Sequence, residues 1–440
     1  MKRITGFIAL LLLSGLLHAQ DISKKLSEAF AVFEADSQLK HAISSLYVTD
    51  AASGKVIFAK NEETGLAPAS TQKIITSVTA FELLGAGYRF TTTVRLVNNE
   101  LVITASGDPA LGSWRWASTK PDEFINSIVT SLKTNKITSI ASIRIEAPGF
   151  TRSAIPGGWI WQDIGNYYGA GAHALNWKEN QFDLLLKSGD KTGDKVDILD
   201  EGYAALYNND LKTAARGTGD NAYIYYDNLV DGTIPAGEKS FRISGAEKDP
   251  GGQFIAELTS ALRKAGISIA GKSGNGAAVA LVNYTSPSLD SLIYWFNKKS
   301  INLYGEALIK AMGKEKGKEA GTDAGIDVLK DFWKEKGLDV TALNMSDGSG
   351  LSPQNRVTTH AQADILRYAR QRPWFAKFYD ALPDYNNMRM KSGTINRVKG
   401  FCGYHTSGGK TYVFSFLVNN YSGAASSLVQ KMYKVLDVLK

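Results

Sequence analysis

Two different patterns divide this chain and limit the folds open to it. From Thr91 to about residue 285, short strand signals are broken by glycine and aspartate, whereas helical periodicity dominates from Ser286 onward. A chain of 440 residues is long enough for two to three domains with sizeable cores. The pattern therefore predicts a multidomain α+β protein in which a strand-rich stretch lies between two other parts of the chain.

The local patterns predict further elements on both sides of that stretch. Residues 45–49 and 55–59 flank a turn, which predicts a hairpin, and a helix follows Ser70 and ends near residue 85. A second hairpin is expected at 91–96 and 100–104, and residues 410–419 alternate like a strand. Helices are expected at 21–34, 122–133, 253–265, 289–298, 302–312, 323–336, 360–370 and 426–439.

The first nineteen residues have the pattern of an export signal. Lys2 and Arg3 precede a mostly apolar run that ends at Leu17, and Ala19 supplies a small residue at the expected cut. This run is short for a membrane span, and no second long apolar segment follows, so no stable membrane span is expected. The single cysteine, Cys402, allows no internal disulfide and is expected to be a small strand residue. These features favour a protein exported to a bacterial periplasm.

A serine and a lysine stand three residues apart in Ser70-Thr-Gln-Lys73, at the start of an apolar helical run. On a helix, residues three apart share one face. The lysine amine can then take the serine hydroxyl proton without a histidine. The motif predicts a serine acyl-transfer enzyme with a lysine base.

Two more short motifs complete the candidate site, although each is weak alone. Ser-x-x-Lys and Lys-[Ser/Thr]-Gly each occur four times, and Ser-x-Asn occurs twice. Context selects Ser300-Ile-Asn302, between two predicted helices where a loop can present side chains. Context also selects Lys391-Ser392-Gly393-Thr394, which precedes a plausible strand at 398–404.

This trio, in this order, is typical of penicillin-binding proteins and class A β-lactamases. Four further segments resemble those of the class C low-molecular-mass penicillin-binding proteins, the D-alanyl-D-alanine carboxypeptidase/endopeptidase family. They are Asn297 to Glu306, Asp347-Gly-Ser-Gly-Leu-Ser352, Ser106-Gly-Asp-Pro109 and Trp159-Ile-Trp-Gln-Asp163. The resemblance spans most of the chain after the signal. Ile301 stands where aspartate is frequent, at a permissive position, and Lys-Ser-Gly keeps the hydroxyl of Lys-Thr-Gly.

The resemblance implies a penicillin-binding/β-lactamase-like transpeptidase domain, an antiparallel sheet with flanking helices, that carries a large strand-rich insertion. The 230 positions from Ser70 to Ser300 are too many for a compact class A enzyme. We predict a split catalytic domain at 20–86 and 285–440, with an inserted domain at 87–182 and 246–284. A small β subdomain at 183–245 is expected within the insertion.

The residue chemistry assigns an expected role to each member of the trio. Ser70 is the candidate nucleophile and Lys73 its base, and burial and the nearby Lys391 cation are expected to lower the pKa of the Lys73 amine. The backbone N–H groups of Ser70 and Thr394 would form the oxyanion hole. Ser300 would pass a proton to the leaving amine, and Asn302 would bond the substrate amide.

The substrate-binding residues are expected in the third motif. Lys391, with the hydroxyls of Ser392 and Thr394 around Gly393, would hold the terminal carboxylate. The resemblance further implies that Asp163 lies near the mouth of the site and pairs with the free amino group of the third stem-peptide residue. A surface acid or helix cap is the alternative for Asp163. Asp347-Gly-Ser-Gly is interpreted as a plain turn and left outside the catalytic set.

Four other functions are open to a chain of this kind. A Ser-His-Asp hydrolase or a zinc peptidase fits poorly, because neither a Gly-x-Ser-x-Gly nor a His-Glu-x-x-His motif occurs. A β-lactamase and a catalytically silent peptidoglycan-binding module remain the alternatives. The expected partners are peptidoglycan stem peptides and acylating β-lactams, with no cofactor, metal or nucleic acid. The balance of carboxypeptidase and endopeptidase activity and the oligomeric state stay open.

Overall fold

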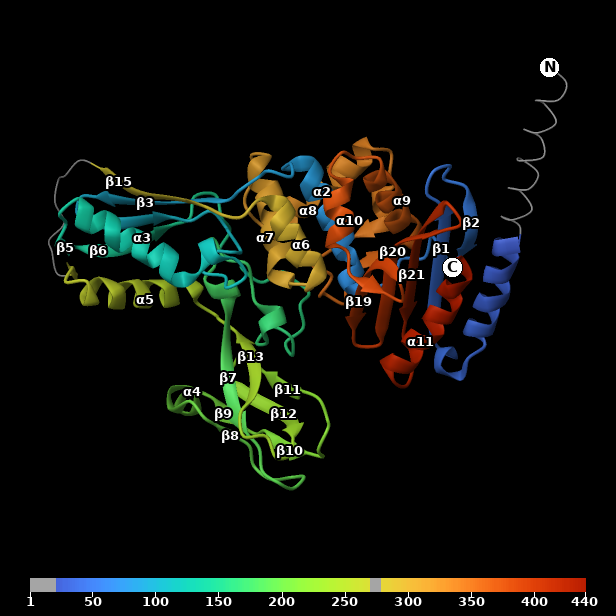
Figure 1. Ribbon diagram of the computed structural model, residues 1–440, viewed down its shortest axis with the longest axis horizontal. Helices are drawn as coiled ribbons and strands as arrows, with labels where there is room; N and C mark the ends of the chain where they lie inside the picture. Colours follow the sequence, from blue (N-terminus) through green and yellow to red (C-terminus); the bar gives the residue numbers. More distant parts are fainter. Residues whose placement is uncertain (1–20, 270–277) are drawn as a thin grey trace, which may run out of the picture. The chain divides into compact units, whose positions relative to one another are not determined.

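The computed structural model describes residues 21–269 and 278–440 (Figure 1). The predicted signal at 1–19 lies outside the described residues. The chain divides by its internal contacts into two units. Unit 1 comprises residues up to Glu82, Ile293–Ser300 and Leu329–Lys440, and unit 2 comprises Leu83–Leu292 and Ile301–Val328. The three-part division predicted above stays a prediction.

Unit 1 is built on a six-stranded antiparallel sheet in the order β18-β19-β20-β21-β1-β2. The strands are β1 (Ile43–Asp50), β2 (Val56–Lys60), β18 (Asp384–Tyr385), β19 (Met388–Ile395), β20 (Val398–Ser407) and β21 (Lys410–Asn419). The predicted hairpin at 45–59 and the predicted strand at 410–419 are therefore confirmed.

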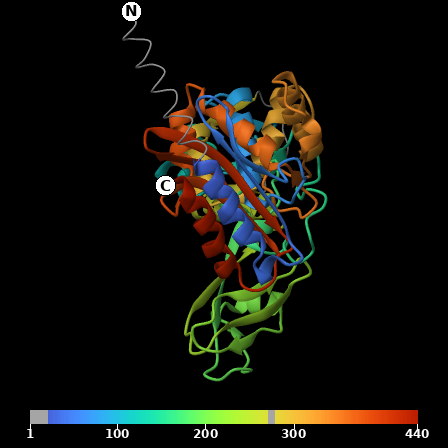
Figure 2. The ribbon, with the colours of Figure 1, turned by 90° about the vertical axis from the view of Figure 1, so that its right-hand side faces the viewer.

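Helices cover both faces of this sheet. On one face, a helix at residues 21–34 and α11 (Ala425–Leu436) lie side by side (Figure 2) and bury Leu26, Phe30 and Leu428 against the sheet. Phe414 and Phe416 of β21 face this core. Ser415, between them, points the opposite way and donates its hydroxyl to Gln362 of α9 (Thr359–Arg370) at 2.7 Å. Alternation along β21 thus separates an apolar layer from a face that carries polar contacts.

Unit 1 contains further helices, two of which begin in unit 2 along the sequence. They are α2 (Lys73–Leu83), α9 (Thr359–Arg370) and α10 (Phe375–Ala381), with α6 (Leu289–Lys298) and α8 (Thr322–Glu335) crossing the boundary in sequence. A two-stranded pair joins β16 (Leu343–Asn344) and β17 (Arg356–Val357). The predicted bounds of α6 are confirmed to the residue.

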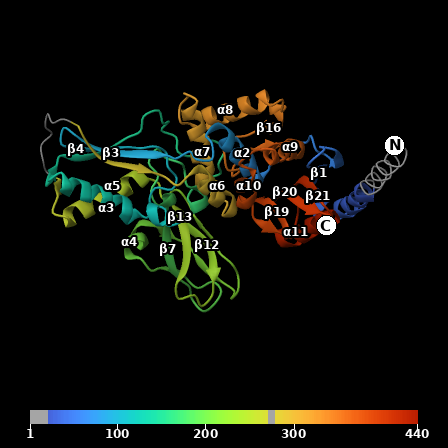
Figure 3. The same ribbon diagram turned by 45° about the horizontal axis from the view of Figure 1, so that its top comes forward.

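Unit 2 contains a four-stranded sheet in the order β15-β3-β4-β6, on which α3 and α5 lie side by side (Figure 3). Its elements are β3 (Thr91–Val97), β4 (Glu100–Thr104), α3 (Pro121–Thr134), β5 (Ser139–Ile140), β6 (Ser142–Glu146), α5 (Pro250–Lys264), β14 (Ser268–Ile269), β15 (Val279–Thr285) and α7 (Asn302–Glu315). A parallel pair joins β5 and β14.

A smaller part of unit 2 has its own core, which includes Leu184, Val230 and Ile243. One sheet has the order β13-β7-β8, and the other pairs β10, β11 and β9 with β12. The elements are β7 (Gln181–Lys187), β8 (Asp197–Ile198), α4 (Glu201–Leu206), β9 (Asn208–Asn209), β10 (Lys212–Ala214), β11 (Asn221–Ile224), β12 (Leu229–Pro235) and β13 (Phe241–Ala246).

These layers agree with the predicted multidomain α+β class. Within residues 21–269 and 278–440, no helix combines the length and apolar character needed to cross a bilayer.

Candidate active site

Ser70 lies in a single 3-10 turn, Ala69–Gln72, that leads directly into α2 at Lys73. The turn is held by the Thr71 hydroxyl, which donates to the Pro68 carbonyl at 2.7 Å. Ala69 has a φ of 47°, a left-handed conformation that L-residues seldom adopt. Strained backbone of this kind persists where the surroundings fix it, and it is frequent beside reacting groups.

The Lys73 amine is buried and directed at the Ser70 hydroxyl. Its Nζ lies 2.9 Å from Ser70 Oγ and 2.6 Å from the carbonyl oxygen of Ser349. The ring of Phe296, from α6, has its centroid 5.6 Å from the same nitrogen. The amine can therefore donate to Ser349 and still present a lone pair to Ser70 when it is neutral.

The segment Asp347-Gly-Ser-Gly is a buried turn that contributes directly to this environment. Asp347 accepts hydrogen bonds from the backbone N–H of Gly350 at 2.7 Å and of Ser352 at 2.6 Å. Gln72, next to Lys73, donates to the Asp347 carbonyl at 2.6 Å. The sequence identified the turn but missed its contact with Lys73, which is made by a backbone oxygen.

Ser300 and Lys391 are brought together in unit 1. Lys391, on β19, is almost fully buried, and its Nζ lies 3.0 Å from Ser300 Oγ and 3.0 Å from the Ser392 carbonyl oxygen. Burial lowers the Lys391 pKa to about 7. Ser300 has a left-handed φ of 57°, and the preceding α6 is fixed to α2 by a 3.0 Å hydrogen bond from Asn297 to Ser77.

The Lys391–Thr394 motif lies within β19, and the strand predicted after it at 398–404 is confirmed as β20. The N–H of Met390 donates to Pro383 at 3.0 Å, on the β18 side. Because the N–H direction alternates along a strand, those of Ser392 and Thr394 point to the same outer edge. The pairing with β18 involves only Arg389 and Met388 among the β19 residues. The Thr394 N–H is thus directed away from β20.

Gly393 brings this strand against the Ala69–Gln72 turn that carries Ser70, the nucleophile turn. A Cβ built at Gly393 would lie 2.5 Å from the Pro68 oxygen and 3.0 Å from the Ser70 nitrogen, so a side chain there would collide with the turn. On the neighbouring β20, Cys402 is fully buried, with its sulfur 3.8 Å from the Thr71 carbonyl oxygen. Burial raises the Cys402 pKa to about 12, which is consistent with a packing residue.

Asn302 and Asp163 belong to unit 2 and are linked there through one residue. The Asn302 side-chain amide donates to the Tyr168 carbonyl at 2.7 Å, and the Tyr168 hydroxyl lies 3.4 Å from Asp163 Oδ1. Burial raises the Asp163 pKa, against the opposing hydrogen bond from Tyr168. The residue pattern does not predict the role of Tyr168, since its contact with Asn302 uses a backbone carbonyl.

Within the described ranges, no group of three or more histidine, cysteine, aspartate or glutamate side chains is arranged to hold a metal ion.

The sequence is similar to known proteins over most of its length. Residues 26–383 match the family described as D-Ala-D-Ala carboxypeptidase 3 (S13). A D-alanyl-D-alanine carboxypeptidase of an Actinomadura species is 25% identical over 90% of this chain and 81% of its own length. The D-alanyl-D-alanine carboxypeptidase DacB of Haemophilus influenzae is 23% identical over 84% of this chain and 83% of its own.

Solved structures share the fold. Penicillin binding protein 4 of Haemophilus influenzae superimposes with a TM-score of 0.74 at 21% identity, covering 95% of this chain and 98% of that one. The same protein in complex with a β-lactam gives a TM-score of 0.70 at 20% identity, covering 96% and 99% of the two chains.

Proposed function

Because the chain belongs to the D-Ala-D-Ala carboxypeptidase 3 (S13) family, we propose that it cleaves D-Ala-D-Ala bonds of peptidoglycan stem peptides through an acyl-enzyme on Ser70. The membership makes it a serine peptidase of the DD-carboxypeptidase/endopeptidase class. The observation that carries the assignment to Ser70 is the 2.9 Å separation between its Oγ and Lys73 Nζ.

Acylation begins with transfer of the Ser70 hydroxyl proton to the neutral Lys73 amine. Ser70 Oγ then attacks the carbonyl carbon of the penultimate D-alanine, and the oxyanion that forms is bound by the N–H groups of Ser70 and Thr394. One oxyanion-hole donor is typically worth about 3–4 kcal/mol of transition-state stabilisation. The outward direction of the Thr394 N–H supports this role.

Collapse of the tetrahedral intermediate breaks the peptide bond and leaves the acyl group on Ser70. The leaving amine takes a proton from the Ser300 hydroxyl, which lies 3.0 Å from Lys391 Nζ. The proton that Lys73 took from Ser70 is returned to Ser300, so Lys73 is neutral again and Lys391 stays an ammonium group. Water, deprotonated by the same amine that activated the serine, then attacks the ester and releases the shortened peptide. Each peptide bond that is cleaved consumes one water molecule.

Substrate recognition uses two charged groups of the stem peptide, its terminal carboxylate and the ammonium group of its third residue. Lys391 in its ammonium form, with the hydroxyls of Ser392 and Thr394, binds the terminal carboxylate. Asn302 bonds the substrate amide, and the Asp163 carboxylate pairs with the ammonium group of the third stem residue. A β-lactam resembles the D-Ala-D-Ala end and acylates the same serine. The site of action is the periplasm, reached through the predicted signal at 1–19.

Labelling with a fluorescent penicillin tests this function. Covalent label on the intact protein that disappears in Ser70→Ala supports it, and absence of label on folded wild-type protein contradicts it. Rapid release of hydrolysed drug would instead indicate a β-lactamase. Digestion of purified monomeric and cross-linked muropeptides, followed by mass spectrometry, then separates removal of terminal D-alanine from cleavage of cross-links.

A further inference from the structure

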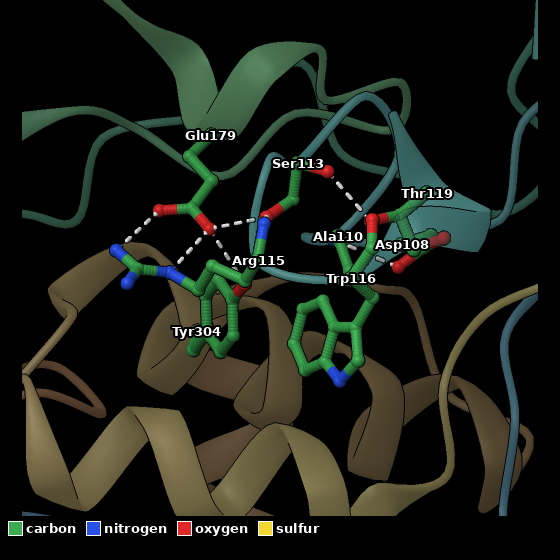
Figure 4. Close-up of polar contacts among 8 residues, drawn as sticks. All are labelled: Asp108, Ala110, Ser113, Arg115, Trp116, Thr119, Glu179 and Tyr304. Carbon is green, nitrogen blue, oxygen red and sulfur yellow. Dashed lines mark hydrogen bonds and ion pairs between the residues drawn. The ribbon is translucent and has the colours of Figure 1, made fainter. Parts of the chain in front are cut away.

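Glu179 is a buried carboxylate of unit 2 that takes no part in the proposed chemistry (Figure 4). It is 3% exposed, and its Oε1 accepts hydrogen bonds from Ser113 Oγ at 2.7 Å and from the Tyr304 hydroxyl at 2.8 Å. Arg115 adds a two-pronged contact, with Nε 2.7 Å from Oε1 and Nη2 3.0 Å from Oε2. A buried carboxylate is tolerated when it is paired and hydrogen-bonded in this way.

The backbone presents Glu179 from an unusual conformation. Lys178, Glu179 and Asn180 are consecutive non-glycine residues with φ values of 52°, 54° and 50°. The Asn180 side chain fixes this left-handed turn, because its oxygen accepts from the Trp177 N–H at 2.9 Å and its nitrogen donates to the Gly171 carbonyl at 2.8 Å. Strain that is locked by such contacts commonly serves a site rather than the fold alone.

The helix that Glu179 contacts begins at a residue of the candidate site. Asn302 is the first residue of α7, and Tyr304, fully buried, follows two residues later. The N-cap residue is Ile301, which makes no side-chain capping hydrogen bond, and Ser300 before it is in the left-handed region. Since a side-chain cap does not fix this helix start, its position depends on tertiary contacts such as that of Tyr304 with Glu179.

We propose that Glu179, with Arg115 and Tyr304, is a positioning network that fixes the first turn of α7 and thereby the orientation of the Asn302 side chain. None of these three residues touches the reacting atoms. Arg115 aligns the Glu179 carboxylate, and that carboxylate holds the Tyr304 hydroxyl. The proposal rests on the proposed function, in which Asn302 bonds the substrate amide.

The test compares Tyr304→Phe and Glu179→Gln with a matched control, Glu257→Gln. Glu257 accepts hydrogen bonds from Lys178 Nζ at 2.6 Å and Trp177 Nε1 at 3.1 Å, in the same unit but on α5. We expect Tyr304→Phe and Glu179→Gln to lower kcat/KM for a peptide ending in D-Ala-D-Ala at least tenfold. The control should stay within twofold of wild type. An equal loss in all three variants would show general destabilisation and overturn the proposal.

A double-mutant cycle with Asn302→Ala separates positioning from a purely structural role. If Tyr304 acts through Asn302, adding Tyr304→Phe to Asn302→Ala lowers kcat/KM less than twofold further. If the two losses multiply, the proposal fails. Arg115→Lys, which retains a cation beside Glu179, should keep more activity than Arg115→Ala.

Hydrogen exchange keeps this test independent of the proposed function. In Tyr304→Phe, amides in the first turn of α7 should exchange at least tenfold faster than in wild type, while those of α5 stay unchanged. Unchanged exchange in α7 overturns the positioning role even in an active enzyme. Failure of wild-type protein to be labelled by penicillin would refute the function, and the exchange result would still decide whether this network fixes the helix.

Discussion

Lys391 should make recognition of the substrate carboxylate strongly dependent on pH. Its amine is buried on β19, and burial lowers its pKa to about 7 from the ordinary 10.5. The direction follows from the charge: in the free enzyme the ammonium form predominates below that pKa, and the neutral form predominates above it. A carboxylate ligand needs the ammonium form, so binding becomes weaker as the pH rises through 7.

The magnitude follows from the fraction of Lys391 that is protonated. With a pKa of about 7, binding of a carboxylate is weakened by a factor of about 2 at pH 7, about 11 at pH 8 and about 100 at pH 9. A substrate whose terminal carboxylate is replaced by an amide lacks this dependence. The ratio of kcat/KM for the two substrates therefore isolates Lys391, because ionisation of the nucleophile and base affects both alike.

The assay measures that ratio from pH 6 to pH 9 with paired peptides ending in D-Ala-D-Ala carboxylate and D-Ala-D-Ala amide. We expect it to fall by about 90-fold across this range in wild type. In Lys391→Arg, whose guanidinium stays charged, the ratio should change less than twofold. A wild-type ratio that is independent of pH would refute the assignment of Lys391 as the carboxylate-binding cation.

Three further outcomes are expected. Burial raises the Asp108 pKa to about 7 from 3.8, so the folded state binds the proton more tightly and stability decreases as the pH rises from about 4 to 7. In urea unfolding, the free energy of unfolding of Asp108→Asn relative to that of wild type should therefore rise by about 3 kcal/mol from pH 5 to pH 8. A difference that stays constant with pH would disprove this. Gly350→Ala should reduce penicillin acylation of folded protein at least tenfold, because Gly350 has a φ of 83° and an added Cβ would lie 1.9 Å from the Ala69 oxygen; normal labelling kinetics would contradict that packing. Asp163→Asn should raise KM about tenfold for a stem peptide with a free ammonium on its third residue and leave the acetylated peptide unchanged, and equal effects on both would exclude a charge contact.

The sequence was most informative where structure depends on neighbours in the chain. Ser70 and Lys73 were identified because three-residue spacing at a helix start is local, and the bounds of α6 follow from its own periodicity. The class of fold followed from the alternation of strand-rich and helical stretches. These features need no knowledge of distant contacts.

Features set by distant pairing were less accessible. The strand predicted after Lys391 is confirmed as β20, whereas β19, which contains Lys391 opposite Cys402 of β20, was not predicted. That strand is defined by its partner and not by its own apolar pattern. Ser349 and Tyr168 contact Lys73 and Asn302 through carbonyl oxygens, which any residue type can supply. Side-chain identity therefore gave no signal for either contact.

The burial of Cys402 has a practical consequence. It is the single cysteine of the chain, and it lies on β20 with its sulfur against the Thr71 carbonyl, behind the nucleophile turn. A thiol reagent can reach it only when the sheet opens locally, so the rate of alkylation reports how often that opening occurs. The alkylation rate of Cys402 in the native protein thus measures how often the region around Ser70 opens locally. An acylating drug that makes this opening rarer should lower the alkylation rate without contacting the sulfur.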